Sequence, residues 1–209
     1  MNAPIIQGSP EWFAMRIGKA TGSRIKDIIA KTKTGYSTSR ANYAAQLVAE
    51  RLTGKVEESF ANAAMKWGTE CEPLARASYE AEMGVMVDEV GMLEHPAIAM
   101  TGASPDGLVG SDGMVEIKCP NTATHIATML SGKADPQYMS QMQWQMVCAN
   151  RAWCDFVSFD PRMPADMQLF IVRVPRDDVL IAEYEKEVIS FLGEVDATVS
   201  KLIALRRGK

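Results

Sequence analysis

Residues 104–120, SPDGLVGSDGMVEIKCP, place two carboxylates and a lysine close together in the chain. Asp106 follows a proline, a turn of Gly, Ser and Asp comes next, and Glu-Ile-Lys ends a short apolar run. A turn near residues 110–113 would bring Asp106 opposite or next to Glu116. Because residues two apart share a face of a strand, Glu116 and Lys118 would point one way and Ile117 into the opposite layer.

Two carboxylates at such a distance need a cation, a shared proton or a basic neighbour. Ligands that are all oxygen favour a hard ion, Mg²⁺ or Mn²⁺, over zinc or copper. A lysine two positions along would hold or deprotonate a water, or stabilise charge on a phosphate oxygen. The pattern therefore points to metal-assisted hydrolysis of a phosphodiester.

A plain polar hairpin is the alternative, because SPDG is an ordinary β-turn sequence and Glu-x-Lys is a common exposed strand pair. The run MVEIKCP around Ile117 is mostly apolar, so a fully solvated Glu116–Lys118 pair is less expected there.

The order of elements along the chain predicts an α/β fold, a central mixed β-sheet flanked by helices. We expect one domain over residues 1–209, with a helical part at 9–84, a catalytic sheet core at 85–175 and a C-terminal helix at 177–206. Ser9 and Pro10 are typical of a helix start, and Gly54 of a helix end. The predicted helices are one from Pro10, 21–31, 37–54, 60–83 with a break or new start near Gly68 and Pro73, 136–150, and 177–206; the predicted strands are 85–93, 97–102, 113–118, 153–160 and 167–174.

Composition narrows the class of protein. The chain of 209 residues is 47% hydrophobic and 23% charged, with no membrane-length apolar run and no signal-peptide pattern. Its four cysteines form no C-x-x-C pair, and His95 and His125 lack zinc-ligand spacing, so we expect reduced thiols in a cytosol and no zinc.

Charge is unevenly distributed along the chain. The first 55 residues hold nine basic and three acidic side chains, a net charge of +6, and the remainder has a net charge of −10. Such a basic segment would attract a polyanion to one face, although an ordinary solvated helical surface explains it equally well.

Five blocks in order carry a family resemblance: EWFAMRIGKATGS, KWGTECEPLA, SPDGLVGSDGMVEIKCP, YMSQMQWQM and FDPRM. Over roughly residues 9–163 the chain resembles the PD-(D/E)xK nucleases of the phage lambda-exonuclease type, the YqaJ-like viral recombinase family. The resemblance implies a restriction-endonuclease-like fold in a single nuclease domain. It also implies a Mg²⁺-dependent (or Mn²⁺-dependent) enzyme with two ions that digests one strand of duplex DNA from a 5′-phosphorylated end and leaves 3′ overhangs. A homotrimeric ring threaded by the DNA end, a phage single-strand annealing protein as partner, and the cytoplasm of a bacterial host follow from the same resemblance.

The resemblance also assigns roles to particular residues. Metal would be held by Asp106, Glu116, the backbone carbonyl of Ile117 and Glu72, with Lys118 as the catalytic lysine and Gln141 beside the scissile phosphate. The 5′-phosphate pocket would be formed by Arg16, Ser23 and Ser104, with Trp12 four residues before the arginine. An arginine fork with hydroxyl groups suits a terminal phosphate dianion.

Each of these residues also has an ordinary structural explanation. Glu72 would be an exposed helix carboxylate, Gln141 and Gln143 helix surface residues, and Arg16 a partner of Glu11. Tyr138, Trp144 and the neighbouring methionines would be core.

Two other functions stay open at this point. One is a Cas4-like or structure-specific nuclease, although a Cas4-like protein needs four cysteines for an iron–sulfur cluster and their spacing here does not suit one. The other is a catalytically silent adaptor that binds DNA ends.

Overall fold

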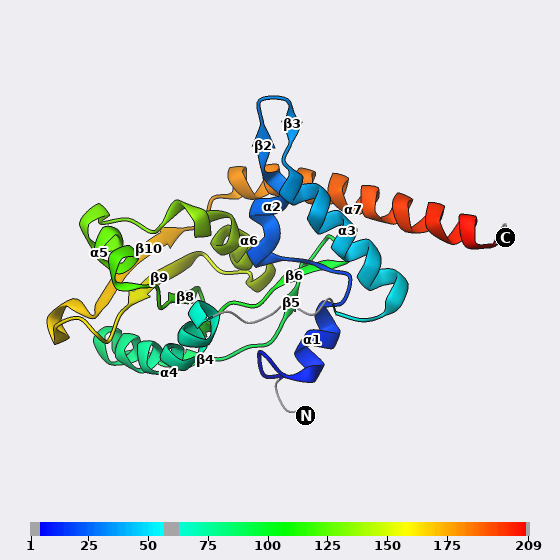
Figure 1. Ribbon diagram of the computed structural model, residues 1–209. Helices are drawn as coiled ribbons and strands as arrows, with labels where there is room; N and C mark the ends of the chain where they lie inside the picture. The colour runs from blue at the N-terminus through cyan, green and yellow to red at the C-terminus, as the bar shows by residue number, and fades with distance from the viewer. Residues whose placement is uncertain (1–4, 57–62, 208–209) are drawn as a thin grey trace.

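The structure is a computed structural model that describes residues 5–56 and 63–207 (Figure 1). At its centre is a five-stranded mixed sheet in the order β10-β9-β8-β7-β4, in which β8 and β9 run parallel and the other neighbours antiparallel. The strands of this sheet are β4 (Val87–Asp88), β7 (Gly107–Val109), β8 (Gly113–Lys118), β9 (Trp153–Phe159) and β10 (Leu169–Pro175). The expected α/β class, a mixed sheet flanked by helices, is confirmed.

The remaining elements surround this sheet. A three-stranded sheet has the order β1-β6-β5, and β2 and β3 form a separate hairpin. The helices are α1 (Pro10–Arg16), α2 (Ile25–Ile29), α3 (Thr38–Thr53), α4 (Ala63–Met83), α5 (Thr122–Ser131), α6 (Met139–Ala149) and α7 (Asp178–Arg207); the short strands are β1 (Ala20–Thr21), β2 (Lys31–Thr32), β3 (Gly35–Tyr36), β5 (Leu93–Glu94) and β6 (Thr101–Ala103); the 3₁₀ turns are Gly22–Arg24, Pro136–Tyr138 and Ala165–Met167.

Strand β8 is buried on both faces, and its successive side chains point alternately to one face and the other. Val115 and Ile117 point to one side, where they pack with Tyr79 of α4. Met114 points to the other side and packs with Met142 of α6. The two faces are therefore covered by different helices, and Glu116 and Lys118 share the α6 face, as the period of two predicts.

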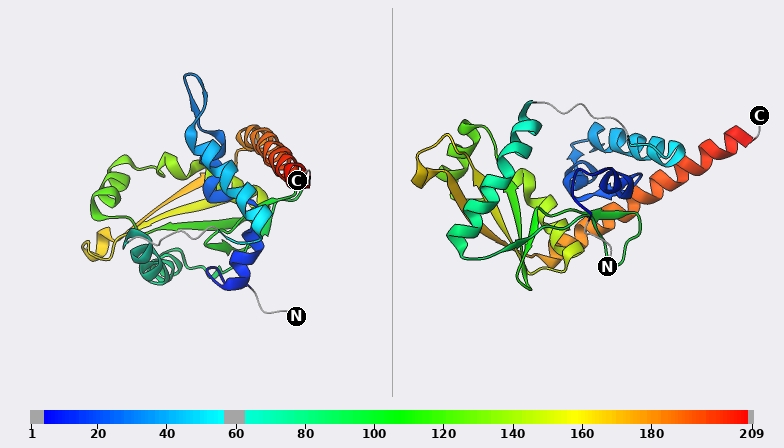
Figure 2. Two further views of the ribbon diagram at one scale, coloured as in Figure 1. Left: turned by 45° about the vertical axis from the view of Figure 1, so that its right-hand side comes forward. Right: turned by 90° about the horizontal axis from the view of Figure 1, so that it is seen from below.

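A second core joins the basic N-terminal segment to the end of the chain. Helices α2, α3, α6 and α7 meet around Ile25, Tyr43, Trp144 and Phe191. The last turns of α7 extend beyond the rest of the molecule (Figure 2). No described helix is long and apolar enough to cross a membrane.

Local signals set several helix ends as predicted. The side chain of Ser9 accepts a hydrogen bond from the N–H of Trp12, with Pro10 in the first turn. Gly54 closes α3 with φ 67°, a left-handed conformation that glycine adopts without strain. Asp177 accepts from the N–H groups of Val179 and Leu180 at the start of α7.

Other boundaries differ from the predictions. The helix expected at 21–31 is a short strand, a 3₁₀ turn and then α2, because the chain at Ala20 first pairs with Thr101. Helix α4 runs unbroken through Gly68 and Pro73, so the break predicted there is wrong. Its packing on the sheet outweighs the weak helix propensity of these two residues. Residues 60–62 of that prediction lie outside the described residues.

The predicted strands 85–93 and 97–102 are also corrected. The first is two separate pairs of residues, β4 and β5, which belong to different sheets. The second shortens to β6 and pairs with β1 and β5, so it is not the hairpin partner of β8. That partner is β7, which was not predicted, and α5 and the β2–β3 hairpin were missed as well.

Candidate active site

The β7–β8 hairpin places Asp106 and Glu116 as the sequence predicts. Gly107 pairs with Val115, so Asp106, one residue before β7, lies opposite Glu116. The Oδ2 atom of Asp106 accepts a hydrogen bond of 2.6 Å from the N–H of Ile117. This bond fixes the loop that carries the aspartate to the edge of the strand that carries the other carboxylate.

Glu116 is fully buried and held by three side chains. Gln141 donates from Nε2 to its Oε1 at 2.5 Å, and Gln145 donates from Nε2 to its Oε2 at 2.7 Å. The ammonium group of Lys118 forms an ion pair with the same carboxylate. These contacts fix the position of both carboxylate oxygens of Glu116.

The carboxylates and the lysine perturb one another. Burial raises the pKa of Asp106 well above its usual range, and the negative charge of Glu116 raises it further. Burial alone would lower the pKa of Lys118, but Glu116 and Asp106 more than offset this, so its pKa is raised and the lysine is charged. Ionisation of both carboxylates would therefore place more negative charge in the site than one lysine neutralises, and a bound cation would relieve that repulsion.

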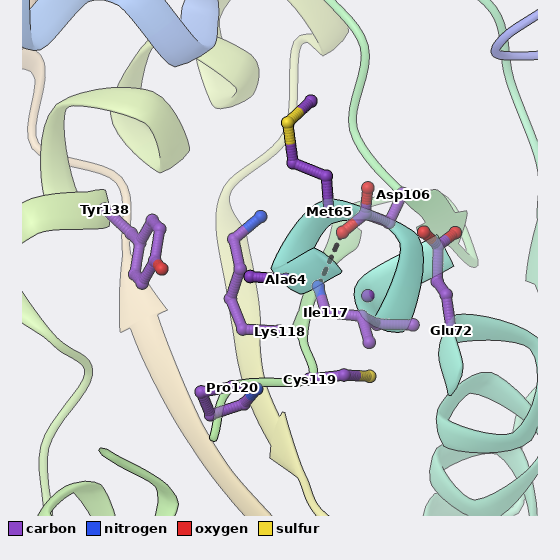
Figure 3. A pocket seen from close by; sticks show the side chains of 10 residues that line it. Ala64, Met65, Glu72, Asp106, Ile117, Lys118, Cys119, Pro120 and Tyr138 are labelled. Atoms are coloured by element: carbon purple, nitrogen blue, oxygen red, sulfur yellow. Dashed lines mark hydrogen bonds between the residues drawn. The ribbon is translucent and has the colours of Figure 1, made fainter. Parts of the chain in front are cut away.

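The larger of two adjoining cavities has a volume of about 420 Å³. Figure 3 shows the carboxylate of Asp106 between the ammonium group of Lys118 and the carboxylate of Glu72. Tyr138 lies on the far side of Lys118, with its ring 5.0 Å from the ammonium nitrogen. The lining residues are Ala64, Met65, Gly68, Glu72, Asp106, Ile117, Lys118, Cys119, Pro120 and Tyr138.

The smaller cavity, of about 150 Å³, gathers the residues expected to bind phosphate. The indole N–H of Trp12 donates to Oγ of Ser104 at 2.9 Å, and the guanidinium of Arg16 lies 4.0 Å from the centre of the Trp12 ring. Burial lowers the pKa of Arg16, which would make binding of an anion there favourable. The lining residues are Gln7, Trp12, Arg16, Gly22, Ser23, Ser104, Asp106, Gln141 and Gln145.

Asp106 lines both cavities. Every residue that the sequence predicts for the metal site or the phosphate pocket, apart from Glu116, lines one or both cavities. Glu116 is connected to the smaller cavity by its hydrogen bonds to Gln141 and Gln145, which line it.

The donor set can be tested against a metal ion. Among the described residues, no three His, Cys, Asp or Glu side chains are grouped so as to hold an ion by themselves. Asp106 and Glu116 supply two carboxylates, and Mg²⁺ is typically bound by one or two carboxylates with water and substrate oxygens completing its shell. The oxygen-only donors, and the repulsion that a cation would relieve between two ionised carboxylates, therefore fit a hard divalent ion that keeps several waters.

The structure agrees with some of the ordinary structural explanations given for these residues and not with others. Gln143 is buried, not on the helix surface, and bonds to the backbone at Pro175 and Asp177. Glu72 is partly exposed and pairs with Arg76 at 2.8 Å. Within the described residues Arg16 stacks on Trp12, and a pairing with Glu11 is not among its contacts.

The four cysteines are free, and Cys71 lies near enough to Cys119 to add to the effect of burial in raising the pKa of that thiol. Cys119, Cys148 and Cys154 each pack against a different hydrophobic cluster. Burial raises the pKa of Cys119 and of Cys148 to about 12, so these thiols are protonated. Thiols in separate cores do not converge on an iron–sulfur cluster, which argues against the Cas4-like alternative.

Two residues of the site were missed from the sequence. Gln145 lies one helical turn after Gln141, and that spacing of four on α6 was the available signal. Tyr138 was predicted to be core and does pack against the cluster around Met142, but it also lines the larger cavity. It stands at the junction between a 3₁₀ turn and α6, and no local pattern marks its direction.

Comparisons with known proteins agree with this geometry. The YqaJ-like viral recombinase domain matches residues 11–152. The crystal structure of an alkaline exonuclease (LHK-Exo) from Laribacter hongkongensis is 54% identical over 96% of this chain and 99% of that chain, with a TM-score of 0.89. LHK-Exo in complex with dAMP is equally similar, with a TM-score of 0.90. A phage-related exonuclease from Haemophilus somnus 129PT, 17% identical over 88% of this chain and 96% of that chain, has a TM-score of 0.70 and supports the fold.

A search of curated protein sequences found no match. The fold, the paired carboxylates beside a lysine and the similar structures together define the class of protein: a nuclease, a phosphodiester hydrolase of the exonuclease class. The chain belongs to the YqaJ-like viral recombinase family.

Proposed function

We propose that this protein is a Mg²⁺-dependent exonuclease, also served by Mn²⁺, that digests one strand of duplex DNA from a 5′-phosphorylated end and leaves 3′ overhangs for phage-type recombination. The observation that carries the proposal is the wall shared by the two cavities, because Asp106 lines both of them. A strand end held in the smaller cavity would present its first internucleotide phosphate to the carboxylates of the larger one.

In the smaller cavity, Arg16 and the hydroxyls of Ser23 and Ser104 bind the terminal phosphate. Trp12 holds two of these groups in place, because it stacks on the guanidinium of Arg16 and donates a hydrogen bond to the hydroxyl of Ser104. A half-buried guanidinium favours a dianionic monoester over a neutral hydroxyl, so the pocket would select phosphorylated ends.

At the larger cavity, Asp106, Glu116 and the carbonyl of Ile117 would hold two divalent ions, with Glu72 as a further ligand. Such ions, when bound, polarise the phosphoryl oxygen and lower the pKa of an attacking water. Lys118 and Gln141 contact the reacting phosphate from the sheet and from α6. The charged ammonium group of Lys118 stabilises the negative charge that develops on the phosphate oxygens and orients the water.

The assembly forms part of the same proposal. A homotrimeric ring around the DNA end, in the cytoplasm of a bacterial host, would direct the basic segment of residues 1–55 inward and the acidic remainder outward. Backbone contacts in such a channel make binding insensitive to base sequence and steeply dependent on salt. A phage single-strand annealing protein would then receive the exposed 3′ strand.

A strand-specific digest tests the proposal. Linear duplex labelled separately at each 5′ and 3′ terminus is incubated with Mg²⁺ and protein, with either a phosphate or a hydroxyl at the 5′ ends. We expect mononucleotides to appear first from the 5′-phosphorylated strand, 3′ overhangs to accumulate, and Lys118→Ala to be inactive. Loss of label first from the 3′ terminus would refute the polarity. Full activity of the lysine variant would refute the site, and end binding without any digestion by the wild type would favour the adaptor.

A further inference from the structure

Gln145 lines the smaller cavity and contacts both Glu116 of the proposed metal site and the backbone of the phosphate pocket. Its Nε2 group donates to Oε2 of Glu116 at 2.7 Å and to the carbonyl oxygen of Ser104 at 3.2 Å. Both partners are acceptors, so the orientation of the amide is fixed with its nitrogen toward them. The side chain is 1% exposed, and its own Oε1 has no hydrogen-bond partner among the described residues.

We propose that Gln145 is a positioning residue that couples recognition of the DNA end to the carboxylate that binds metal. The meaning of the two cavities rests on the proposed function, but the coupling itself is a property of this one side chain. One amide nitrogen fixes a metal ligand and the backbone of the phosphate pocket at the same time.

A series of hydrogen bonds, together with one stacking contact, links Glu116 to the smaller cavity through Ser104. Glu116 is bonded to Gln145, which is bonded to the carbonyl of Ser104, whose hydroxyl accepts from Trp12. Arg16 stacks on that indole at 4.0 Å. A change in the position of Gln145 would therefore reach both the carboxylate and the guanidinium.

Packing on the opposite side of Gln145 strengthens the link. A Cβ atom placed at Gly22 would lie 3.8 Å from Cγ of Gln145 and 3.0 Å from Cβ of Ala103. The turn that carries Ser23 thus rests against the stem of the same glutamine. The side chain contacts three parts of the site through its nitrogen and its stem, while its buried oxygen has no donor among the described residues.

Gln145→Met removes both donors at similar volume, and Gln143→Met is the matched control. Gln143 lies on the same helix and is equally buried, at 1% exposure, and its hydrogen bonds go to the carbonyl of Pro175 and the N–H of Asp177, away from the cavities. Both changes delete a buried amide, so a purely structural effect would appear in both.

Two readouts are compared: Mn²⁺ and Mg²⁺ affinity by calorimetry without DNA, and the ratio of kcat/KM on 5′-phosphate to 5′-hydroxyl ends. Groups that support metal ligands typically contribute 10- to 100-fold to metal affinity. We expect Gln145→Met to weaken metal binding by about that factor and to reduce the end-preference ratio, and Gln143→Met to leave both at the wild-type value. Gln145→Asn, which keeps the amide but is one methylene shorter, should show the same two losses and serves if the methionine variant does not fold.

Weaker metal binding with an unchanged end preference would overturn the coupling, and so would equal losses in the Gln143 control. If the wild type binds no metal and shows no preference for phosphorylated ends, the proposed function fails first. If the wild type shows both properties and the Gln145 variants keep both, only the present inference fails.

Discussion

Arg16→Ala should remove the preference for phosphorylated ends. The guanidinium stacks on Trp12 in the smaller cavity, and the described residues place no carboxylate in an ion pair with it. Its N–H groups are therefore available to a ligand. Two charge-assisted hydrogen bonds to a phosphate, each with a net worth of roughly 1.5 kcal/mol, give about 3 kcal/mol. That corresponds to about a 100-fold loss of kcat/KM.

The assay compares linear duplexes that differ only in the 5′ group. Arg16→Ala should lower kcat/KM on phosphorylated ends by about 100-fold and hardly change it on hydroxyl ends. Arg24→Ala is the control, because Arg24 belongs to the same basic segment but pairs with Asp27 and stacks on Tyr43. The control loses the same charge, so we expect less than about a threefold change on either end. Equal losses on both ends for Arg16→Ala would show that the cavity does not recognise the phosphate.

Three further outcomes follow from other parts of the structure. Tyr79→Phe removes a 2.8 Å hydrogen bond to the buried Asp155, and urea unfolding should show a loss of about 2 kcal/mol, whereas a change below about 0.5 kcal/mol would mean the bond contributes little. Burial alone would raise the pKa of Asp160, but hydrogen bonds, foremost from Arg162, hold it at about 2, below the unfolded value of about 3.9. The free energy of unfolding of the wild type should therefore fall as pH decreases from about 5 to 2, and that of the Asp160→Asn variant should fall less steeply. The same dependence on pH in both proteins would contradict this. Lys118→Met should reduce turnover by about 10²–10⁴-fold while DNA binding, measured by fluorescence anisotropy, persists, and near-normal turnover would exclude a catalytic role.

The part of the site that was predictable from sequence depends on short-range geometry. The period of two in β8 was enough to place Glu116 and Lys118 on one face and Ile117 on the other. The turn at 110–113 then brought Asp106 opposite Glu116, as the register of Gly107 with Val115 confirms. These relations involve neighbours within about a dozen residues, where local pattern and tertiary structure agree.

The predictions that were wrong concern elements whose partners lie far away in the chain. Strands of two or three residues carry no periodicity, so β4 and β5 were merged into one predicted strand and β7 was missed. Helix α5 is rich in threonine, which favours other structures, but its ends carried a readable signal. Asn121 caps the helix through Thr124, and Gly132 ends it with φ 63°.

Buried polar residues were the other source of error. Gln143 and Gln145 look like surface residues in sequence, yet each is 1% exposed because its partners come from elements that fold against α6. Their burial follows from hydrogen bonds to Pro175 and Glu116, which no local propensity encodes.

The common wall formed by Asp106 also matters for the design of inhibitors. The two cavities, of about 150 and 420 Å³, both have Asp106 in their lining. A phosphate-bearing fragment for one and a chelating fragment for the other would thus need only a short tether. Joining two weak ligands in this way raises their effective concentration to about the millimolar range without any new contact, so a compact bidentate molecule should bind far more tightly than either half.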